Sequence, residues 1–86
     1  MIRDQIVDSF APVLKAAEFK CPIITVYKHP ADRPTKYVAR LFDLQESTPF
    51  IAVGDTLEDV RRAIPRRFIR FSPDYRDPSC IIETWI

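Results

Sequence analysis

The chain has 86 residues, 47% of them hydrophobic and 12% aromatic, and its 13 basic and 12 acidic side chains leave a formal net charge of +1. A chain of this length forms one small domain with a thin core, which excludes a large enzyme with a separate cofactor-binding domain. The balanced charge excludes a polybasic nucleic-acid coat, and the single glycine excludes a glycine-rich phosphate loop. We therefore predict one folded domain over residues 1–86.

Neither a membrane span nor a secretory signal is predicted. No segment has the roughly 20 consecutive apolar residues that cross a bilayer, and the first segment, MIRDQIVDSF, carries two aspartates and no apolar block. Cys21 and Cys80 are too few for a secreted disulfide scaffold, so we expect a cytoplasmic protein with reduced thiols, with a disulfide between them as the open alternative. His29 is the only histidine and no Cys-x-x-Cys pair occurs, so neither a metal site nor a cofactor is predicted.

The first segment of regular structure is expected to be a helix. Residues 2–19 carry apolar side chains at steps of three and four, which predicts a helix with one apolar face. Pro12 disturbs this segment, because proline removes a hydrogen bond inside a helix and is tolerated only in its first turn. Two forms stay open: a kinked helix, or a firm helix near residues 10–19 with Ser9 as its N-cap.

Three strands are predicted next. The β-branched and aromatic run at 23–27 predicts the first, and residues 36–44, with apolar side chains on both faces, predict a central second strand. Residues 50–53 predict the third. The prolines of residues 28–35 indicate a loop, and QESTP at 45–49 indicates a turn.

A second helix is predicted from Thr56 to Ile64. Gly54 would permit a sharp strand-to-helix turn, because glycine tolerates positive φ. Thr56 and Asp59 have the spacing of a capping box at the start of the helix. Pro65 ends it.

The last part of the chain completes a sheet. Residues 66–71 predict a short strand or an irregular edge, residues 72–79 a loop, and residues 80–86 a final strand at the edge of the sheet. The fold class is then α+β: a two-layer sandwich of two helices on a mostly antiparallel sheet of three to five strands, in the order α-β-β-β-α-β-β.

The segment from residue 36 to residue 64 resembles the core of HicB-type antitoxins. The resemblance depends on the motif Gly-Asp-Thr-Leu-Glu at 54–58 and covers about a third of the chain. In that family a strand pair leads through such a turn into a helix, on a partial RNase H-like fold. The resemblance implies a protein-binding, antitoxin-like role and supplies no active site.

A cluster of basic side chains is the clearest candidate site. Five arginines fall within ten residues: Arg61, Arg62, Arg66, Arg67 and Arg70. Their guanidinium groups could bind phosphates or an acidic partner, with Phe68 and Phe71 stacking on single-stranded bases. The alternative is a solvated helix end whose cations pair with neighbouring acids.

Aromatic side chains give a second candidate surface. Trp85, on the expected edge strand, and Tyr37 are predicted interface residues, because amphipathic aromatics are enriched at binding hot spots. Burial of Trp85 beneath the helices is the open alternative. We predict a non-enzymatic binding domain, with a protein partner or a second copy bound to it, and a nucleic-acid-binding accessory protein as the alternative.

Catalytic readings of the polar residues have simpler explanations. His29 has no serine, cysteine or paired acid implied beside it, so a solvent-exposed loop histidine is expected. Asp43, Glu46, Asp55 and Glu83 could meet at one sheet edge and bind Mg²⁺ as in a nuclease, but helix caps and solvated charges explain each of them. No enzymatic activity is predicted, with a metal-dependent nuclease as the remaining alternative.

Overall fold

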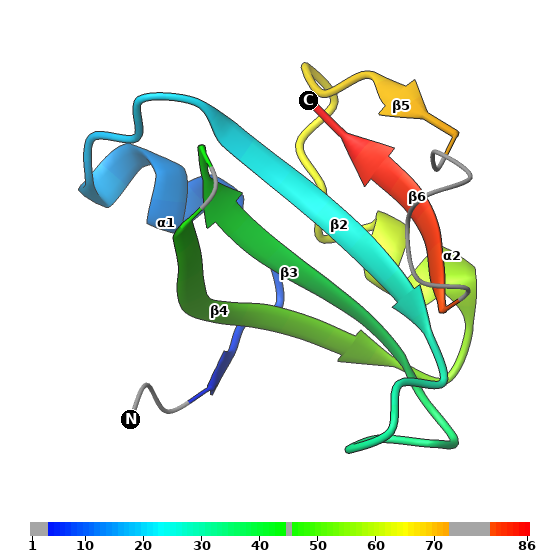
Figure 1. Cartoon of the computed structure of the whole chain (residues 1–86). Helices are drawn as coiled ribbons and strands as arrows, with labels where there is room; N and C mark the ends of the chain where they lie inside the picture. The colour runs from blue at the N-terminus through cyan, green and yellow to red at the C-terminus, as the bar shows by residue number, and fades with distance from the viewer. Residues whose placement is uncertain (1–3, 45, 73–79) are drawn as a thin grey trace.

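Six strands form one mixed sheet in the spatial order β1-β4-β3-β2-β6-β5 (Figure 1). The computed structural model describes residues 4–44, 46–72 and 80–86. In chain order the elements are β1 (Gln5–Ile6), α1 (Ala11–Ala16), β2 (Pro22–Lys28), β3 (Tyr37–Asp43), β4 (Glu46–Gly54), α2 (Leu57–Arg61), β5 (Arg70–Phe71) and β6 (Ile81–Trp85). β1 runs parallel to β4, and every other neighbouring pair is antiparallel.

The predicted α+β class is confirmed, whereas the strand count and order were wrong. The sheet has six strands, and the described elements begin with a strand and not with a helix. β6 was expected at the edge but lies between β2 and β5. The reason is that the chain after α2 returns along β6, where Ile69 and Ile86 exchange both backbone hydrogen bonds, at 2.9 and 3.0 Å. Of the loop predicted over residues 72–79, all but the first residue lies outside the described residues.

The N-terminal helix is much shorter than the periodicity predicted. Gln5 and Ile6 pair with β4 as a strand, and α1 covers only Ala11–Ala16. Pro12 lies in the first turn of α1, the one part of a helix that tolerates it. Ser9 does not serve as the N-cap residue, although its Oγ accepts a hydrogen bond from the backbone N–H of Ala11 at 3.2 Å.

β4 contains most of the segment that was predicted as a turn. Proline has no N–H for a strand ladder, and the register of β3 against β4 shifts between Arg40 and Phe42, opposite the segment that contains Pro49. The carbonyl of Leu41 accepts a hydrogen bond from Thr48 Oγ at 2.6 Å. The Leu41 carbonyl thus has a side-chain donor at the irregularity, and β4 continues through the proline.

The start of α2 confirms the predicted capping box. Thr56 Oγ1 accepts from the backbone N–H of Asp59, and the Asp59 carboxylate accepts from the backbone N–H of Thr56, both at 3.2 Å. The role predicted for Gly54 was wrong, because no glycine in the described residues has a positive φ. A side chain is excluded here by space, since an added Cβ would lie 2.5 Å from Cβ of Asp59.

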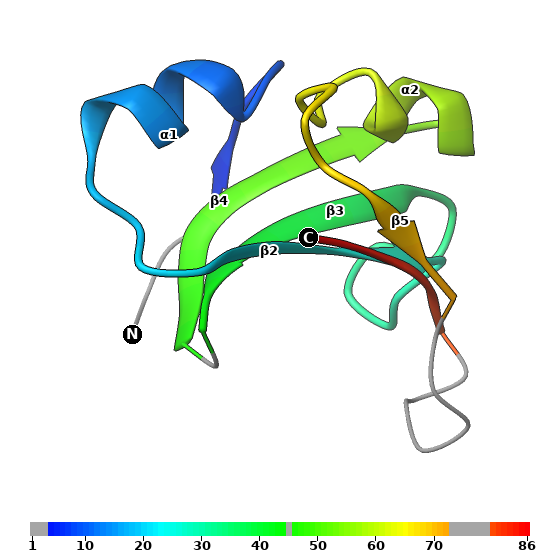
Figure 2. The same ribbon diagram turned by 90° about the horizontal axis from the view of Figure 1, so that it is seen from above.

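Both helices lie on the same face of the sheet, as the view from above shows (Figure 2). The buried core lies between the helices and the sheet. Its side chains come from β2, β3, β4, α2 and the residues next to the two helices: Phe10, Ile24, Val26, Ala39, Leu41, Ala52, Val60, Ala63, Ile64 and Phe68. The loop of residues 29–36 lies against the opposite face (Figure 2). We call this second face, which carries no helix in the described part of the chain, the open face. Neither helix has the length and apolar character needed to cross a bilayer, as judged over the described residues.

The two cysteines cannot pair within one folded chain. Cys21 precedes the first residue of β2, whereas the carbonyl of Cys80 accepts from Lys28 at the far end of the same strand. A strand of this length separates them by roughly 20 Å, and a disulfide requires Cα atoms less than about 7 Å apart.

We predict that Gly54→Ala lowers the free energy of unfolding by about 1–3 kcal/mol, because the new methyl group overlaps Asp59. Urea denaturation measures the effect. The matched control introduces Gly54→Ala into an Asp59→Gly background, where the opposing Cβ is absent and the added cost should largely disappear. An equal cost in both backgrounds would contradict the steric explanation.

Candidate functional site

The predicted arginine cluster divides into two groups around one buried carboxylate. Glu83 is 5% exposed and is the only charged residue buried in the described part of the chain. Arg61 of α2 donates to both of its oxygens, with Nε at 3.1 Å from Oε1. Arg70 of β5 approaches Oε2 at 3.4 Å, and the indole N–H of Trp85 donates to Oε1 at 3.1 Å. Arg61 and the more exposed Arg70 are therefore the counter-ions of this buried carboxylate.

The network determines the charge state of Glu83. Burial acts to raise the pKa of this carboxyl, but the hydrogen bonds from Arg61, Trp85 and Arg70, with the positive charge of Arg61, outweigh it. The pKa lies below its ordinary value, so the buried group is a carboxylate at neutral pH. The hydrogen bond between Arg61 and Glu83 also raises the pKa of the Arg61 guanidinium. Glu83 thus joins α2, β5 and β6 through charge-assisted bonds.

The other three arginines face solvent. The Arg62 side chain is 78% exposed and lies 3.9 Å from an Asp59 carboxylate oxygen, the range of a weak surface pair. Arg66 is exposed, and the guanidinium of Arg67 lies 4.8 Å from the centroid of the Phe68 ring. Phe68 itself belongs to the core, so it is not a platform for stacking bases. Four of the five predicted arginines are therefore exposed, including Arg70, which also contacts Glu83.

The two predicted interface aromatics lie on the helix-covered side. Trp85 pairs with Ile24 across the sheet, and Trp85 and Tyr37 are both partly buried against the core. Tyr37 also makes an edge-to-face contact with His29, with ring centroids 5.2 Å apart. Burial against the core, the alternative weighed for Trp85, is the arrangement found.

The carboxylates considered as an alternative magnesium site are dispersed. The carboxylate of Asp43 accepts from the backbone N–H of Cys21 at 2.8 Å, and Asp55 forms an ion pair with Lys36. Glu83 is enclosed by arginines on the helix-covered face. Within the described residues no three His, Cys, Asp or Glu side chains gather as metal ligands would.

A row of apolar side chains crosses the open face instead. Phe42 of β3 pairs with Ile23 of β2, and the Ile24–Trp85 pairing brings Ile86 beside Ile23 one step further along. Ile86 in turn exchanges backbone hydrogen bonds with Ile69. Because directly paired residues share a face of a sheet, these four side chains form a continuous row across four chain segments.

Phe71 enlarges this row. It pairs with Thr84, which pairs with Thr25 on the same face. We call Ile23, Phe42, Ile69, Phe71 and Ile86 the open-face patch. Ile69, Phe71 and Ile86 are 64%, 49% and 51% exposed, and no helix among the described residues covers them.

The patch was missed in the sequence although part of its signal was present. Residues 36–44 were predicted to be apolar on both faces, a pattern typical of strands covered on both sides. The contribution of Ile69, Phe71 and Ile86 depends on the pairing of β5 with β6, which local periodicity does not predict.

Comparisons with known proteins do not identify the chain: no family model, no curated protein and no solved structure matches it. The resemblance to HicB-type antitoxins therefore stays a prediction.

We predict that Glu83→Gln lowers the free energy of unfolding by about 1–3 kcal/mol near neutral pH, because Arg61, Arg70 and Trp85 lose their charged acceptor. Since folding lowers the pKa of Glu83, its contribution is complete above the unfolded pKa and is lost as pH falls through the folded pKa. Acid should therefore destabilise the variant less than the wild type.

Fluorescence of Trp85, the only tryptophan, reports the unfolding of both proteins in urea at neutral and acid pH. Glu46→Gln is the matched control, because it makes the same change of charge at an exposed position. The interpretation fails if Glu83→Gln and Glu46→Gln have equal effects.

Proposed function

We propose that the chain is a protein-interaction domain that self-associates through the open-face patch. The observation that supports this proposal is the exposure of Ile69, Phe71 and Ile86 in one continuous apolar row, on a sheet face that no helix of the described residues covers. An antiparallel sheet with one solvated face normally carries polar side chains on that face. Contiguous apolar surface on a small protein is typical of a binding site.

A second copy is the partner best matched to this surface. The patch contains no charged side chain, and the chain carries a formal net charge of only +1, so two copies approach without strong repulsion. In a twofold dimer the same residues of both chains meet, and such closed dimers are the commonest oligomers. Two sheets that pack face to face lie about 10 Å apart, and apolar side chains on both inner faces fill the space between them.

The dimer is tested by sedimentation equilibrium over a wide range of protein concentration. We expect the mass of the wild-type chain to rise from 10.0 kDa toward twice that value. The double variant Ile69→Ser/Ile86→Ser should stay at the mass of one chain, because it removes two of the most exposed apolar side chains of the patch.

Ile6→Ser is the matched control for this experiment. Ile6 is 61% exposed on β1, which is separated from β6 by three strands and from β5 by four, so its substitution should leave association unchanged. Circular dichroism shows whether each variant is folded. A wild-type chain that stays monomeric at millimolar concentration would refute self-association.

The HicB resemblance proposes a different protein, a toxin, as the partner of such a domain. The motif that carries it, residues 54–58, forms the turn into α2 on the helix-covered side. The open-face patch supplies no support for that specific partner, so self-association is the proposal tested first.

Nucleic-acid binding is the alternative proposal, supported by the exposure of Arg62, Arg66 and Arg67. It has weaker support because Glu83 engages Arg61 and Arg70. Salt-sensitive retention on single-stranded nucleic acid that disappears in Arg66→Ala/Arg67→Ala would favour it. Absence of retention at low salt would exclude it.

A further inference from the structure

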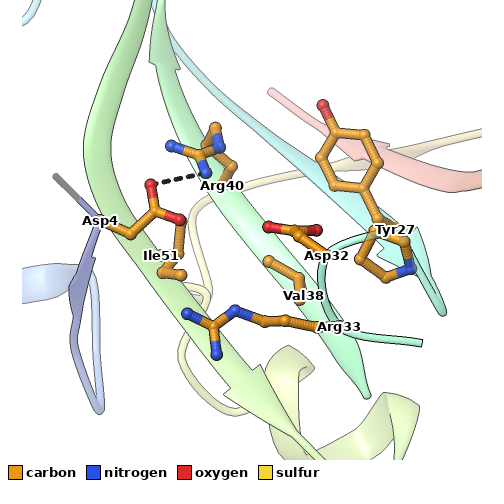
Figure 3. Close-up of a pocket in the computed structure, with 8 residues that line it drawn as sticks. Asp4, Tyr27, Asp32, Arg33, Val38, Arg40 and Ile51 are labelled. Atoms are coloured by element: carbon orange, nitrogen blue, oxygen red, sulfur yellow. Dashed lines mark hydrogen bonds and ion pairs between the residues drawn. The ribbon is translucent and has the colours of Figure 1, made fainter. Parts of the chain in front are cut away.

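A small pocket opens on the half of the open face that lies under the loop of residues 29–36. It has a volume of about 120 Å³ and is drawn in Figure 3. Val38 and Ile51 give it an apolar floor, and both are nearly or fully buried. The remaining lining residues are Asp4, Tyr27, Pro30, Asp32, Arg33 and Arg40.

The loop holds the pocket in place through its own backbone. The N–H of His29 donates to the carbonyl of Lys36 at 2.9 Å and closes the loop. Within it, the N–H of Arg33 donates to the carbonyl of Pro30 at 2.9 Å, and the N–H of Lys36 donates to the carbonyl of Arg33 at 3.1 Å. Arg33 is therefore fixed at the junction of two turns, with its side chain lining the pocket (Figure 3).

The two guanidinium groups of the pocket differ in their partners. Arg40 donates to the Asp4 carboxylate at 2.8 Å and to the carbonyl of Thr48 at 3.0 Å, so its charge is neutralised within the chain. Arg33 has a buried Nε that finds no hydrogen-bond acceptor among the described residues. A buried N–H without an acceptor is rare in folded proteins and needs an explanation.

The chemistry of the pocket selects the kind of ligand that would bind the Arg33 guanidinium. A guanidinium fork matches the planar geometry of a carboxylate, which accepts two hydrogen bonds side by side. The floor of Val38 and Ile51 suits a short alkyl group attached to that carboxylate. The carboxylate of Asp32, which also lines the pocket, repels a dianion such as phosphate more strongly than a singly charged carboxylate.

We propose that this pocket binds a small organic carboxylate through Arg33. The carboxylate is either a free acid or the acidic side chain of a protein. The pocket shares the open face with the patch, but the proposal stands on Arg33 and does not require self-association.

The proposal is tested by titrating the folded chain with sodium propionate at constant ionic strength while recording backbone amide NMR shifts. We expect saturable shifts at Arg33, Val38, Arg40 and Ile51. Arg33→Gln should weaken binding at least tenfold, and Arg33→Lys, which keeps the charge but loses the fork, should weaken it less. Arg66→Gln, an exposed arginine outside the pocket, should bind like the wild type.

A parallel titration with the peptide acetyl-Ala-Glu-Ala-amide distinguishes the two sources of the carboxylate. Tighter binding of the peptide than of propionate identifies an acidic protein side chain, and equal or weaker binding identifies a free acid. Shifts that do not saturate with either probe, or that are unchanged in both Arg33 variants, overturn the proposal. Ile69→Ser/Ile86→Ser should bind propionate normally, so failure of this site and failure of self-association are separable.

Discussion

The buried carboxylate of Glu83 is the interaction on which the rest of the sheet edge depends. It draws Arg61 from α2 and Arg70 from β5 onto the helix-covered face, and a carboxylate at such a position is tolerable only with these partners. Because side chains alternate along a strand, Ile69 and Phe71 lie on the face opposite to that of Arg70. The pairing of β5 with β6 then aligns Ile69 with Ile86. The contacts of Glu83 on one face and the apolar patch on the other thus depend on the same pairing of β5 with β6.

The open face is divided into two chemically different halves by the way the β2–β3 loop folds back. The loop lies over Val38 and Ile51, which are consequently buried although they point away from the helices. On the other half the patch has no such cover in the described part of the chain. The central strands β2 and β3 contribute to both halves, and their opposite side carries core residues such as Ile24 and Leu41. This arrangement supports binding by a preformed surface, with little ordering needed on association.

Much of the fold could be predicted from local sequence, and the site mostly could not. The strands β2, β3 and β6 and the Thr56 capping box follow from β-branched runs and cap spacing, which are local signals. The two-residue β1 is too short to carry a periodicity, so the apolar steps that continue into α1 were extended through it. The bonds from Arg61 and Arg70 to Glu83 span 22 and 13 residues, a separation at which no spacing rule distinguishes an internal counter-ion from a surface arginine. Trp85 was placed at an edge for the same reason, since the pairing of β5 is non-local.

The two helices have six and five residues, and they cover one face of a six-stranded sheet. A domain of this size buries only about three-fifths of the surface of its unfolded chain, and the open-face patch is apolar surface that could still be buried. Packing that face against a second copy would give the sheet the second covered side that its apolar strands are suited to. Self-association would then stabilise the folded state by mass action, because only folded chains dimerise and dimerisation draws the folding equilibrium toward them. The same apolar row would thus serve both as the binding surface and as the missing layer of the core.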